Sequence, residues 1–551
     1  MKRYIHWFVK SVKGHWGAMT LMMLCHVLLA GCSVAFVYVC KRLVDIAVAS
    51  FAGRVVHHHL WQWLAVMAGV IVLRISLNAI RTYLQTKTEI RVKNSLRSKL
   101  FDIILRSGYD DARKYHTADM INRIQEDVRV VSSAAAGAIP NFIGTLLQLL
   151  AAFSFLVYLD IRLALLIIII VPVGLLIGKY ITGRVRSLTH DIRSRDSRVQ
   201  AHLQESIQHL TLLQTLEYED ESSDELGTLQ GELYNSEIKR TRFSVVSRMF
   251  ISLAFQAGHA VAFMWGVLGI SHGTVTYGMM TAFLQLVGQI QRPLLEMSTQ
   301  VPSIIHSTAS IDRIMQIEDI NCETSEDSVL LPSPAGIKME GVKFAYADAS
   351  MDVLDGFSFD FKPGSRTAIV GPTGVGKTTL IRLLLALLKP QEGCISIYVD
   401  AGQSTQPQVC PVSAATRCNL IYVPQGNTLF SGTIRDNLLM GNPDASESQL
   451  EDALRISAAD FVFTLPDGLD TQCFEAGAGL SEGQAQRVAI ARALLRPGSI
   501  LLLDEFSSAL DAHTETLLME RLTTSLPDHT MIFITHRDKI IDYCESTLRL
   551  G

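Results

Sequence analysis

The chain has 551 residues, of which 48% are hydrophobic and 19% charged, and its mean hydropathy is +0.26. This composition excludes an intrinsically disordered chain, a small disulfide scaffold and a collagen-like fibre. With 49 basic and 53 acidic residues the net charge is -4, which gives no reason to expect a nucleic-acid partner. The nine cysteines include no C-x-x-C pair, so the sequence indicates neither a zinc site nor a redox motif.

Long apolar runs with few charges occupy the N-terminal part of the chain. A bilayer core is crossed by about 20 mainly apolar helical residues. Six segments approach that length: residues 17–39, 60–80, 138–159, 163–181, 250–270 and 279–297. The last of them is the least apolar, because three glutamines and an arginine interrupt it. We therefore expect six membrane-spanning helices.

Lysine and arginine are concentrated in two of the connections between these segments. The connections after the second and fourth segments are long and basic (81–129 and 184–248), whereas the connection 271–276 holds no basic residue. Basic loops stay on the cytoplasmic side of a membrane, so we expect both termini and both long loops to be cytoplasmic. Lys41, Arg42 and Arg54, in the first outer loop, are the exception to this pattern.

The two basic connections have apolar residues at helical spacing over 89–105 and 191–213. This spacing predicts that spans two to five continue as long helices into the cytoplasm, with breaks near 108–117 and 209–218 at exposed tips. Independent soluble insertions are the alternative. A stretch rich in acidic residues, proline and serine follows the last span, which predicts a membrane domain over 1–318, a linker over 319–336 and a second domain over 337–551.

A phosphate-binding loop stands near the start of the second domain. The β-rich run 367–370 leads into the pattern G-x-x-x-x-G-K-T, and a helical run follows. Glycines let the backbone wrap phosphate oxygens closely, and the helix N-terminus adds its positive end. We expect Lys377 to bridge the β- and γ-phosphates and Thr378 to ligate magnesium. The predicted nucleotide-contacting residues here are Gly371, Pro372, Thr373, Gly374, Val375, Gly376, Lys377, Thr378 and Thr379.

A second strand, at residues 500–504, ends in two neighbouring carboxylates. Asp504 is suited to the magnesium shell, held through water. Glu505 is placed to polarise the attacking water. Behind a phosphate-binding loop at this separation, the pattern predicts nucleotide hydrolysis with Mg²⁺ as a cofactor.

Together with Leu480-Ser481-Glu482-Gly483-Gln484, these motifs resemble the ATPase domain of an ABC transporter, whose signature is usually L-S-G-G-Q. The resemblance covers nearly the whole chain and is to an exporter-type half-transporter. It implies an all-α, six-helix membrane domain followed by an α/β P-loop ATPase domain. It also implies that Ser481, Gly483 and Gln484 contact nucleotide bound by a partner protomer.

The resemblance assigns roles to further residues. Tyr346 is similar in position to the aromatic residue that stacks on adenine, and Gln425 to the residue that ligates magnesium and contacts the membrane half. His536 matches the γ-phosphate histidine, and residues 508–511 match the loop that crosses the dimer interface. Glu475 falls where exporters carry an acidic contact to a coupling helix.

Two stretches depart from the family pattern. Glu482 replaces the usual glycine of the signature, and a carboxylate pointing at a partner's γ-phosphate would repel it. An outward orientation of Glu482 is compatible with turnover. Residues 400–419 are unusually polar, and we expect a surface loop there, without a chemical role.

The chain carries one phosphate-binding loop and one signature, so the resemblance implies a two-fold dimer with two shared sites. We expect a homodimer, with a heterodimer of two different halves as the alternative. The tips near 108–117 and 209–218 are the candidates for coupling to the membrane. Residues 115–119, with Asn122 and Arg123, resemble the sequence that flanks the first coupling tip of exporters.

The expected function is ATP-driven export or flipping of an amphipathic, lipid-like, peptide or drug-like substrate across the cell (inner) membrane. The alternatives are an importer on the exporter fold and an ATP-regulated channel or receptor. Polar residues inside spans are costly and indicate function. The other interpretation is hydrogen bonding between helices, or snorkelling for Arg74 near a cytoplasmic end. The spans contain His26, Arg74, Asn78, Asn141, Gln148, Gln256, His259, Gln285 and Gln289.

Overall fold

The computed structural model describes residues 2–51, 58–113, 115, 117–323, 327–346, 352–372, 374–400, 408–474 and 479–550. The chain divides into two compact units, and each is described by itself. The helical unit comprises Met1–Asp102 and Thr117–Asp319. The sheet unit comprises Ile103–His116 and Ile320–Gly551.

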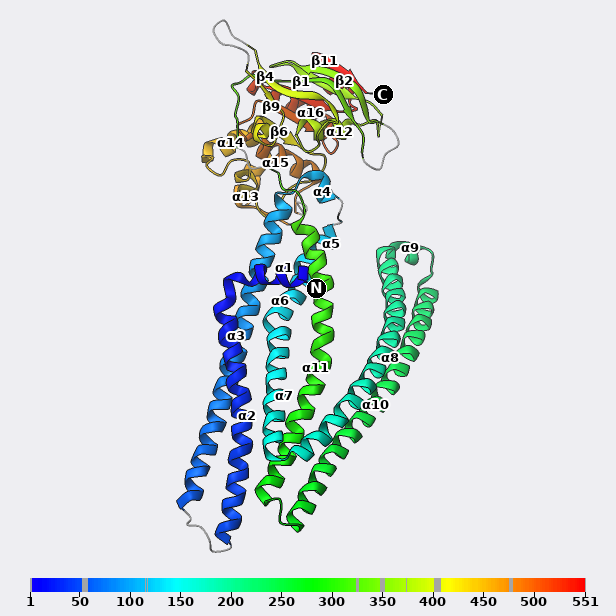
Figure 1. Cartoon of the computed structure of the whole chain (residues 1–551). Helices are drawn as coiled ribbons and strands as arrows, with labels where there is room; N and C mark the ends of the chain where they lie inside the picture. The colour runs from blue at the N-terminus through cyan, green and yellow to red at the C-terminus, as the bar shows by residue number, and fades with distance from the viewer. Residues whose placement is uncertain are drawn as a thin grey trace. The chain divides into compact units, whose positions relative to one another are not determined.

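Six long helices dominate the helical unit (Figure 1). They are α2 (Trp16–Phe51), α3 (His58–Leu105), α7 (Ile139–Leu159), α8 (Ile161–Gln208), α10 (Glu219–Ser271) and α11 (Tyr277–Glu318). Shorter elements are α1 (Lys2–Val12), η1 (Lys13–His15), α5 (Thr117–Asn122), α6 (Val128–Ser133), α9 (Leu210–Thr215) and two π-helical turns, η2 (Arg123–Asp127) and η3 (Ala134–Ala138). The expected six-helix class is confirmed, while the bounds of the individual spans stay predictions.

Four of the described helical stretches are long and apolar enough to cross a membrane: Lys13–Phe51, His59–Leu105, Thr117–Leu159 and Glu219–Ser271. The fourth predicted span lies in α8, where the side chains of 166–180 fall outside the described part of the structure. The sixth lies in α11, which contains Pro293 and Pro302 as well as the glutamines noted above. A chain built this way satisfies its backbone hydrogen bonds within each helix, as a bilayer requires.

The predicted continuation of the spans into long helices is confirmed. Helix α3 has 48 residues and runs without a break to Leu105, and α8 has 48 residues and runs to Gln208. Helix α10 has 53 residues. The predicted breaks are present too, since α9 forms a short turn of helix between α8 and α10.

One residue, Asp160, joins α7 to α8 and fixes the turn between them. Its extended backbone ends α7, and its side chain accepts hydrogen bonds from the backbone N–H groups of Arg162 (2.9 Å) and Leu163 (3.2 Å). This is the N-cap arrangement that satisfies otherwise unpaired donors at a helix start. The other carboxylate oxygen accepts from Trp265 Nε1 at 2.9 Å, which ties the turn to α10.

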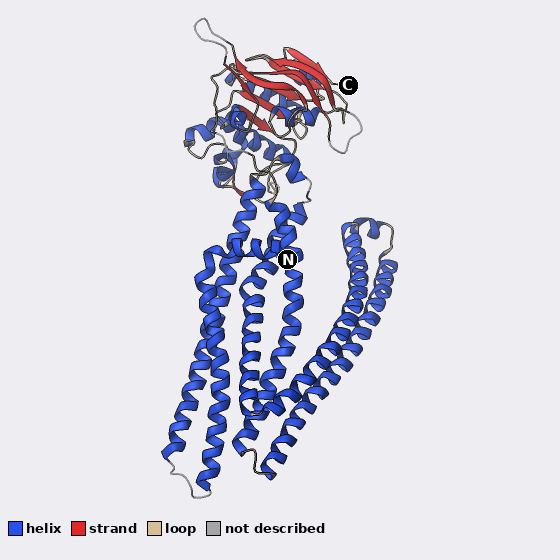
Figure 2. Cartoon of the chain, viewed as in Figure 1, coloured by secondary structure: helices blue, strands red, loops and turns tan. Residues whose placement is uncertain are grey.

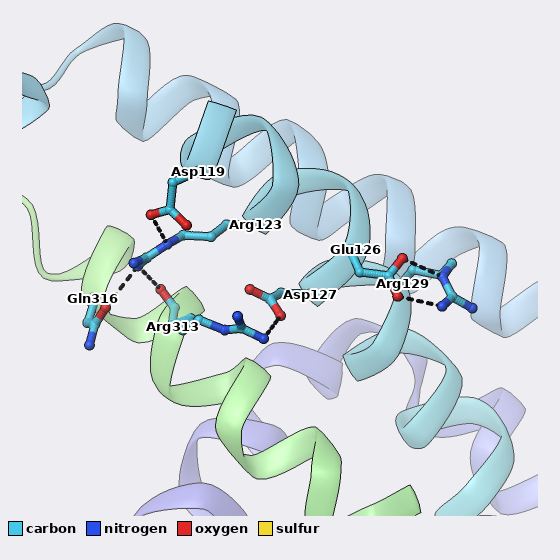
Figure 3. Close-up of polar contacts among 7 residues, drawn as sticks. All are labelled: Asp119, Arg123, Glu126, Asp127, Arg129, Arg313 and Gln316. Atoms are coloured by element: carbon cyan, nitrogen blue, oxygen red, sulfur yellow. Dashed lines mark hydrogen bonds and ion pairs between the residues drawn. The ribbon is translucent and has the colours of Figure 1, made fainter. Parts of the chain in front are cut away.

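The start of the third membrane helix is fastened to α11 by a polar network (Figure 3). Arg123 donates to Asp119 Oδ2 (2.8 Å), to the Arg313 carbonyl (3.1 Å) and to Gln316 Oε1 (2.8 Å). Arg313 in turn donates to Asp127 Oδ1 at 2.7 Å, and Asp127 is only 1% exposed. A buried carboxylate is stable only when paired, so this contact fixes the register of α11 against η2.

The sheet unit contains a five-stranded parallel sheet in the order β11-β3-β10-β9-β6 and a four-stranded antiparallel sheet in the order β2-β1-β4-β5 (Figure 2). The strands are β1 (Gly336–Phe344), β2 (Leu354–Phe361), β3 (Arg366–Val370), β4 (Glu392–Val399), β5 (Gln408–Pro411), β6 (Leu420–Val423), β9 (Ile500–Asp504), β10 (Thr530–Ile534) and β11 (Ser546–Arg549), with a small pair β7 (Gly432–Thr433) and β8 (Gln472–Cys473). The helices are α12 (Lys377–Leu384), α13 (Ile434–Leu439), α14 (Glu447–Ile456), α15 (Glu482–Leu494), α16 (Ala512–Ser525) and α17 (Asp538–Ile541), with single turns η4 (Ala415–Asn419), η5 (Asp460–Thr464) and η6 (Gly468–Asp470). Parallel strands buried on both faces explain the continuous apolar runs of β9 and β10.

The first predicted coupling tip packs within the sheet unit. It forms the short helix α4 (Tyr109–Arg113), and the Gly108 N–H donates to the Asn321 carbonyl at 3.2 Å. The guanidinium of Arg382 lies 5.1 Å from the centre of the Tyr109 ring, a cation–π contact. Tyr115 is described, whereas Lys114 and His116 lie outside the described residues.

The expectation of a surface loop over 400–419 is wrong for its second half. Residues 408–411 form β5, whose Ser396–Pro411 and Val399–Gln408 pairs join it to the edge of the antiparallel sheet. An edge strand tolerates Pro411, because one side of it needs no donor. Asn419 is fully buried, and its side chain accepts from the Leu331 N–H at 2.7 Å.

Candidate nucleotide site

Three neighbouring parallel strands end at one edge of the five-stranded sheet. Ile534 on β10 pairs with Ile369 on β3 and with Asp504 on β9, so the residues that follow these strands emerge side by side. The loop after β3 leads into α12, and the residues after β10 include His536. Ligands of α/β sheets bind at the carboxyl ends of the strands, which is where the predicted residues converge.

Glycines shape the loop between β3 and α12. Gly374 (φ +88°) and Gly376 (φ +106°) have left-handed backbone conformations that other residues rarely adopt. A Cβ on Gly376 would also lie 2.7 Å from Val353 Cγ1. Pro372 is exposed and Val375 is partly buried, while the predicted contact Thr373 lies outside the described residues. The loop therefore presents backbone at its surface, as phosphate binding requires.

Lys377, the first residue of α12, is held back against the protein. Its side chain is 8% exposed, and Nζ donates to the Gly371 carbonyl (2.6 Å) and contacts His536 Nε2 (2.7 Å). An ammonium group has only donors, so Nε2 of His536 is the acceptor of this pair. Two of the three donors of the ammonium group thus face protein partners.

Glu505 turns sharply out of β9. Its φ of +45° is unusual for a residue other than glycine, and strain of this kind concentrates at functional sites. The backbone N–H donates to the Ile534 carbonyl at 3.0 Å, which supports the turn. The carboxylate accepts from Gln425 Nε2 (2.6 Å) and lies 3.7 Å from His536 Nε2. Two further predicted residues, Gln425 and His536, thus lie at the Glu505 carboxylate, and the three come from different segments of the chain.

Asp504 is the buried member of the carboxylate pair. Burial, with the neighbouring Glu505 carboxylate, raises the pKa of Asp504 to about 6, against the opposing effect of Lys377. Asp504, the Thr378 hydroxyl and the side-chain oxygen of Gln425 are hard oxygen donors of the kind that Mg²⁺ prefers. The Gln425 oxygen is available because the amide nitrogen is the atom that contacts Glu505. The residues present therefore fit a magnesium ion.

Tyr346 lies beside the phosphate-binding helix rather than among apolar core residues alone. Its hydroxyl is 3.1 Å from Thr379 Oγ1 and accepts from Arg382 Nη1 at 3.1 Å. Its ring packs edge-on against Phe344 at 5.1 Å. Thr379 is buried and engaged by this contact, and its contact with nucleotide stays a prediction. Stacking of Tyr346 on adenine stays a prediction.

The signature segment forms the start of α15, a helix of 13 residues. Ser481 is its N-cap and accepts from the Gln484 N–H at 3.2 Å, while the Gln484 side chain accepts from the Ser481 N–H at 2.9 Å. Gly483 packs against the predicted interface loop, since a Cβ there would lie 2.6 Å from the Ala509 carbonyl oxygen. Glu482 is exposed in the first turn, an orientation compatible with turnover. Glu475 lies outside the described residues.

The sequence analysis missed two arginines that hold this site together. Arg382 bridges Tyr346 and Tyr109, which links the nucleotide side of α12 to α4. Arg537 contacts the Glu515 carboxylate and donates to the Leu510 carbonyl at 3.3 Å, so it supports the interface loop. Only the position of Arg537 directly after His536 hinted at a role, and nothing in the sequence pattern indicated one for Arg382.

Two family models match this chain. A model described as the ABC transporter transmembrane region matches residues 19–294, which is just over half of the chain. A model described as ABC transporter matches residues 354–508. The chain therefore belongs to the ABC transporters. It is a membrane protein and an ATP-hydrolysing half-transporter, with both domains fused in one chain, and this arrangement implies dimerisation with another half-transporter.

Individual proteins of known name or structure are similar along most of the chain. YgaD of Bacillus subtilis (strain 168), named as a candidate multidrug export ATP-binding/permease protein, is 27% identical over 482 residues, which cover 86% of this chain and 82% of that protein. A fatty acid ABC transporter ATP-binding/permease protein of Mycobacterium bovis (strain ATCC BAA-935 / AF2122/97) is 28% identical over 82% of this chain and 70% of its own length. The solved structure of a bacterial Atm1-family ABC exporter with ATP bound has a TM-score of 0.78 at 23% identity and covers 98% of this chain and 94% of that one, which shows the exporter fold.

Proposed function

We propose that two copies of this chain form an ATP-driven exporter or flippase for amphipathic substrates in the cell membrane, with the sheet unit on the cytoplasmic side. The observation that carries the proposal is the convergence of Lys377, Glu505 and His536 at one sheet edge. A site that only sensed ATP would have little need for a carboxylate and a histidine beside the γ-phosphate position.

The distribution of motifs supports a homodimer. Each chain carries a complete phosphate-binding edge and one exposed signature helix start, at Ser481. Two-fold, head-to-tail pairing of identical chains would place the start of α15 from one protomer over the nucleotide of the other. The positive end of a helix is suited to a γ-phosphate.

The chain's own residues supply three actions in the proposed cycle. Lys377 leaves His536 and neutralises phosphate charge, which frees His536 to contact the γ-phosphate. Glu505 orients the attacking water, and Gln425 holds the Glu505 carboxylate until nucleotide arrives. Mg²⁺, held by Thr378, Asp504 and Gln425, supplies charge neutralisation when bound.

The amphipathic character of the substrate is supported by relatives and by the spans. Similar proteins are named for multidrug or fatty acid transport. Polar side chains stand within otherwise apolar helices of this chain, as a mixed polar and apolar pathway requires.

Reconstituted protein tests the proposal. We expect Mg²⁺-dependent, vanadate-sensitive ATP hydrolysis that depends on dimers, and at least a hundredfold loss of it in Glu505→Gln. Glu520→Gln, which changes an exposed glutamate of α16, is the matched control and should keep the wild-type rate. Full-speed hydrolysis by isolated protomers, or by Glu505→Gln, would contradict the proposal. Transport into inside-out vesicles establishes the direction.

A further inference from the structure

A cavity of about 670 Å³ lies within the helical unit, between α2, α3, α7 and α11. It gathers five of the nine polar span residues singled out from the sequence, namely His26, Arg74, Asn78, Asn141 and Gln148, and adds Arg81. We propose that this cavity binds the head group of an anionic amphiphile, with Arg81 as the main anion contact. The inference rests on the proposed transport function and names its substrate class.

Arg81 is held in place by neutral partners and keeps unused donors. Nη1 donates to Asn141 Oδ1 at 2.9 Å and Nη2 to Asn78 Oδ1 at 3.0 Å. Nε is buried and has no hydrogen-bond partner in the described part of the chain. Because a guanidinium only donates, both amides must turn their oxygens toward it, and their NH₂ groups remain as further donors. The cluster of Arg81, Asn78 and Asn141 therefore offers many hydrogen-bond donors, while the Oδ1 atoms of both asparagines already accept from Arg81.

The charge of the cavity is also positive. Arg74 lies two helical turns from Arg81 on the same face of α3, and neither arginine forms an ion pair with the described residues. Glu296 is the acidic residue of the lining, and it is paired with Arg292 at 3.3 Å. Arg74 lies within the second predicted span and Arg81 directly follows its cytoplasmic end. An arginine that is shielded from water and has no acidic partner is costly, so an anionic ligand would supply the missing negative charge. Arginine also matches carboxylate and phosphate in shape.

His26 adds a further polar side chain to the cavity lining. A Cβ on Gly144 would lie 2.0 Å from His26 Nδ1, so the glycine on α7 allows the imidazole to lie flat against that helix. The ring makes no hydrogen bond with the described residues, although its side chain is buried. Gln300 Oε1 is a buried acceptor without a partner, which leaves room for a hydroxyl or a protonated oxygen of the head group.

The lining also includes apolar side chains that suit a hydrocarbon chain. Leu29 and Phe36 come from α2, two turns apart, and Ile71 and Ile75 from α3. The volume lies in the range of small-molecule sites, about 300–1,000 Å³. Hydrogen bonding between helices, one alternative interpretation of these polar residues, leaves Arg81 Nε without a partner among the described residues. For Arg74 the alternative is snorkelling toward the cytoplasmic end of the helix.

Photolabelling of the full-length protein in nanodiscs, without nucleotide, tests this assignment. The probe is palmitic acid with a diazirine in its chain, and labelled peptides are mapped by mass spectrometry. We expect labelling within 26–36 and 71–81, and competition by palmitate or hexadecyl phosphate, whichever head fits better. Hexadecanol and hexadecyltrimethylammonium should compete at least tenfold less well.

Variants distinguish an effect of the arginine charge from a loss of folding. Arg81→Gln should weaken labelling about tenfold, Arg74→Gln about threefold, and Arg81→Glu should favour hexadecyltrimethylammonium over palmitate. Arg42→Gln is the matched control, because Arg42, on α2 of the helical unit, donates to the Tyr38 hydroxyl at 3.0 Å and does not line the cavity. Equal competition by hexadecanol, or wild-type labelling of both Arg81→Gln and Arg74→Gln, would overturn the inference. Selective labelling in a protein that hydrolyses no ATP would refute the proposed function alone, and unselective labelling in an active ATPase would refute this inference alone.

Discussion

The nucleotide site and the membrane cavity are both polar clusters, but the chain builds them in different ways. The nucleotide site collects residues at the ends of strands and the start of a helix, where the backbone itself fixes direction: Glu505 follows β9, His536 follows β10 and Lys377 begins α12. The cavity collects residues from the middles of four helices, where direction depends on how each helix is rotated. A site of the first kind is encoded locally, and one of the second kind by packing.

The difference predicts how each site responds to change. Residues of the nucleotide site act on a reacting group and have no substitute, so single changes there should be nearly all-or-none. Residues that pack helices share their task with neighbours, so single changes should be graded and should appear in stability or selectivity. Mutations in the two sites therefore test this difference.

The largest effect is expected for Lys377→Ala. Lys377 carries the only ammonium group at the described part of the phosphate-binding loop. Its loss should reduce kcat/KM for ATP about a thousandfold, equivalent to about 4 kcal/mol. Steady-state hydrolysis by reconstituted protein measures it. Lys389→Ala, which removes an exposed lysine after α12, should leave kcat/KM unchanged. If Lys377→Ala lowered kcat/KM less than tenfold, the nucleotide site would tolerate substitution in the graded way expected of the membrane cavity.

The next effect concerns stability in the helical unit. Arg313→Ala leaves Asp127 buried and without its partner, which should cost about 3 kcal/mol of stability. Thermal unfolding of the detergent-purified protein, followed by cysteine accessibility, measures the shift.

Arg129→Ala provides the comparison, because the Arg129–Glu126 pair in the same helix segment is exposed (Figure 3). Exposed pairs contribute little, so the melting temperature should hardly change. Equal shifts for the two variants would mean that burial of Asp127 is not what fixes the register of α11.

Much of the nucleotide site was predictable because its residues keep fixed places along the chain. The phosphate-binding loop, Asp504 with Glu505, and His536 each follow an apolar strand, and parallel pairing brings strand ends together. The structure places these residues at one edge, while their roles toward nucleotide stay predictions. Helix lengths were also predictable, since the apolar spacing continues through the charged parts of α3 and α8.

Other features depend on packing and left no readable pattern. The edge strand β5 was hidden by Gln408 and Pro411, which are typical of loops. The partners of Arg382 come from distant segments, and the π-helical turn η2 contains ordinary helix-forming residues. The polar span residues were found one by one, but only the rotation of the helices decides that Arg81 and Asn141 meet.

A smaller effect should follow from the raised pKa of Asp504, about 6 against the ordinary 3.8. A carboxyl group whose pKa is higher in the folded state than in the unfolded state destabilises the fold when ionised. The penalty is absent below about pH 4, grows as the pH rises through 6, and is complete above it.

Asp504→Asn removes this penalty. Without nucleotide and with EDTA, the variant should be more stable than the wild type at pH 7.5 by ~2 kcal/mol, and the difference should vanish near pH 4. Thermal unfolding at several pH values measures both. Binding of Mg²⁺ with ATP should be weaker in the variant, so stability and function would move in opposite directions. A pH-independent difference would show that Asp504 is not the titrating group.

The smallest effect concerns Glu482, which stands exposed at the positive start of α15. In the proposed dimer this carboxylate partly cancels the field that a partner's γ-phosphate would meet. Glu482→Gly should therefore lower KM for ATP two- to threefold at low salt, and the gain should shrink as salt screens the charge. Steady-state kinetics at low and high ionic strength measure both values.

Glu482→Gln separates charge from backbone freedom, because it keeps the size of the side chain and removes only the charge. If charge is the cause, Glu482→Gln should reproduce the gain of Glu482→Gly. A gain confined to Glu482→Gly would instead assign the effect to the freedom that glycine gives the segment between Ser481 and Gly483. A lower rate in Glu482→Gln would mean that the carboxylate assists closure of the dimer. Glu482 would then be a locally encoded residue whose role cannot be read from its position in the motif.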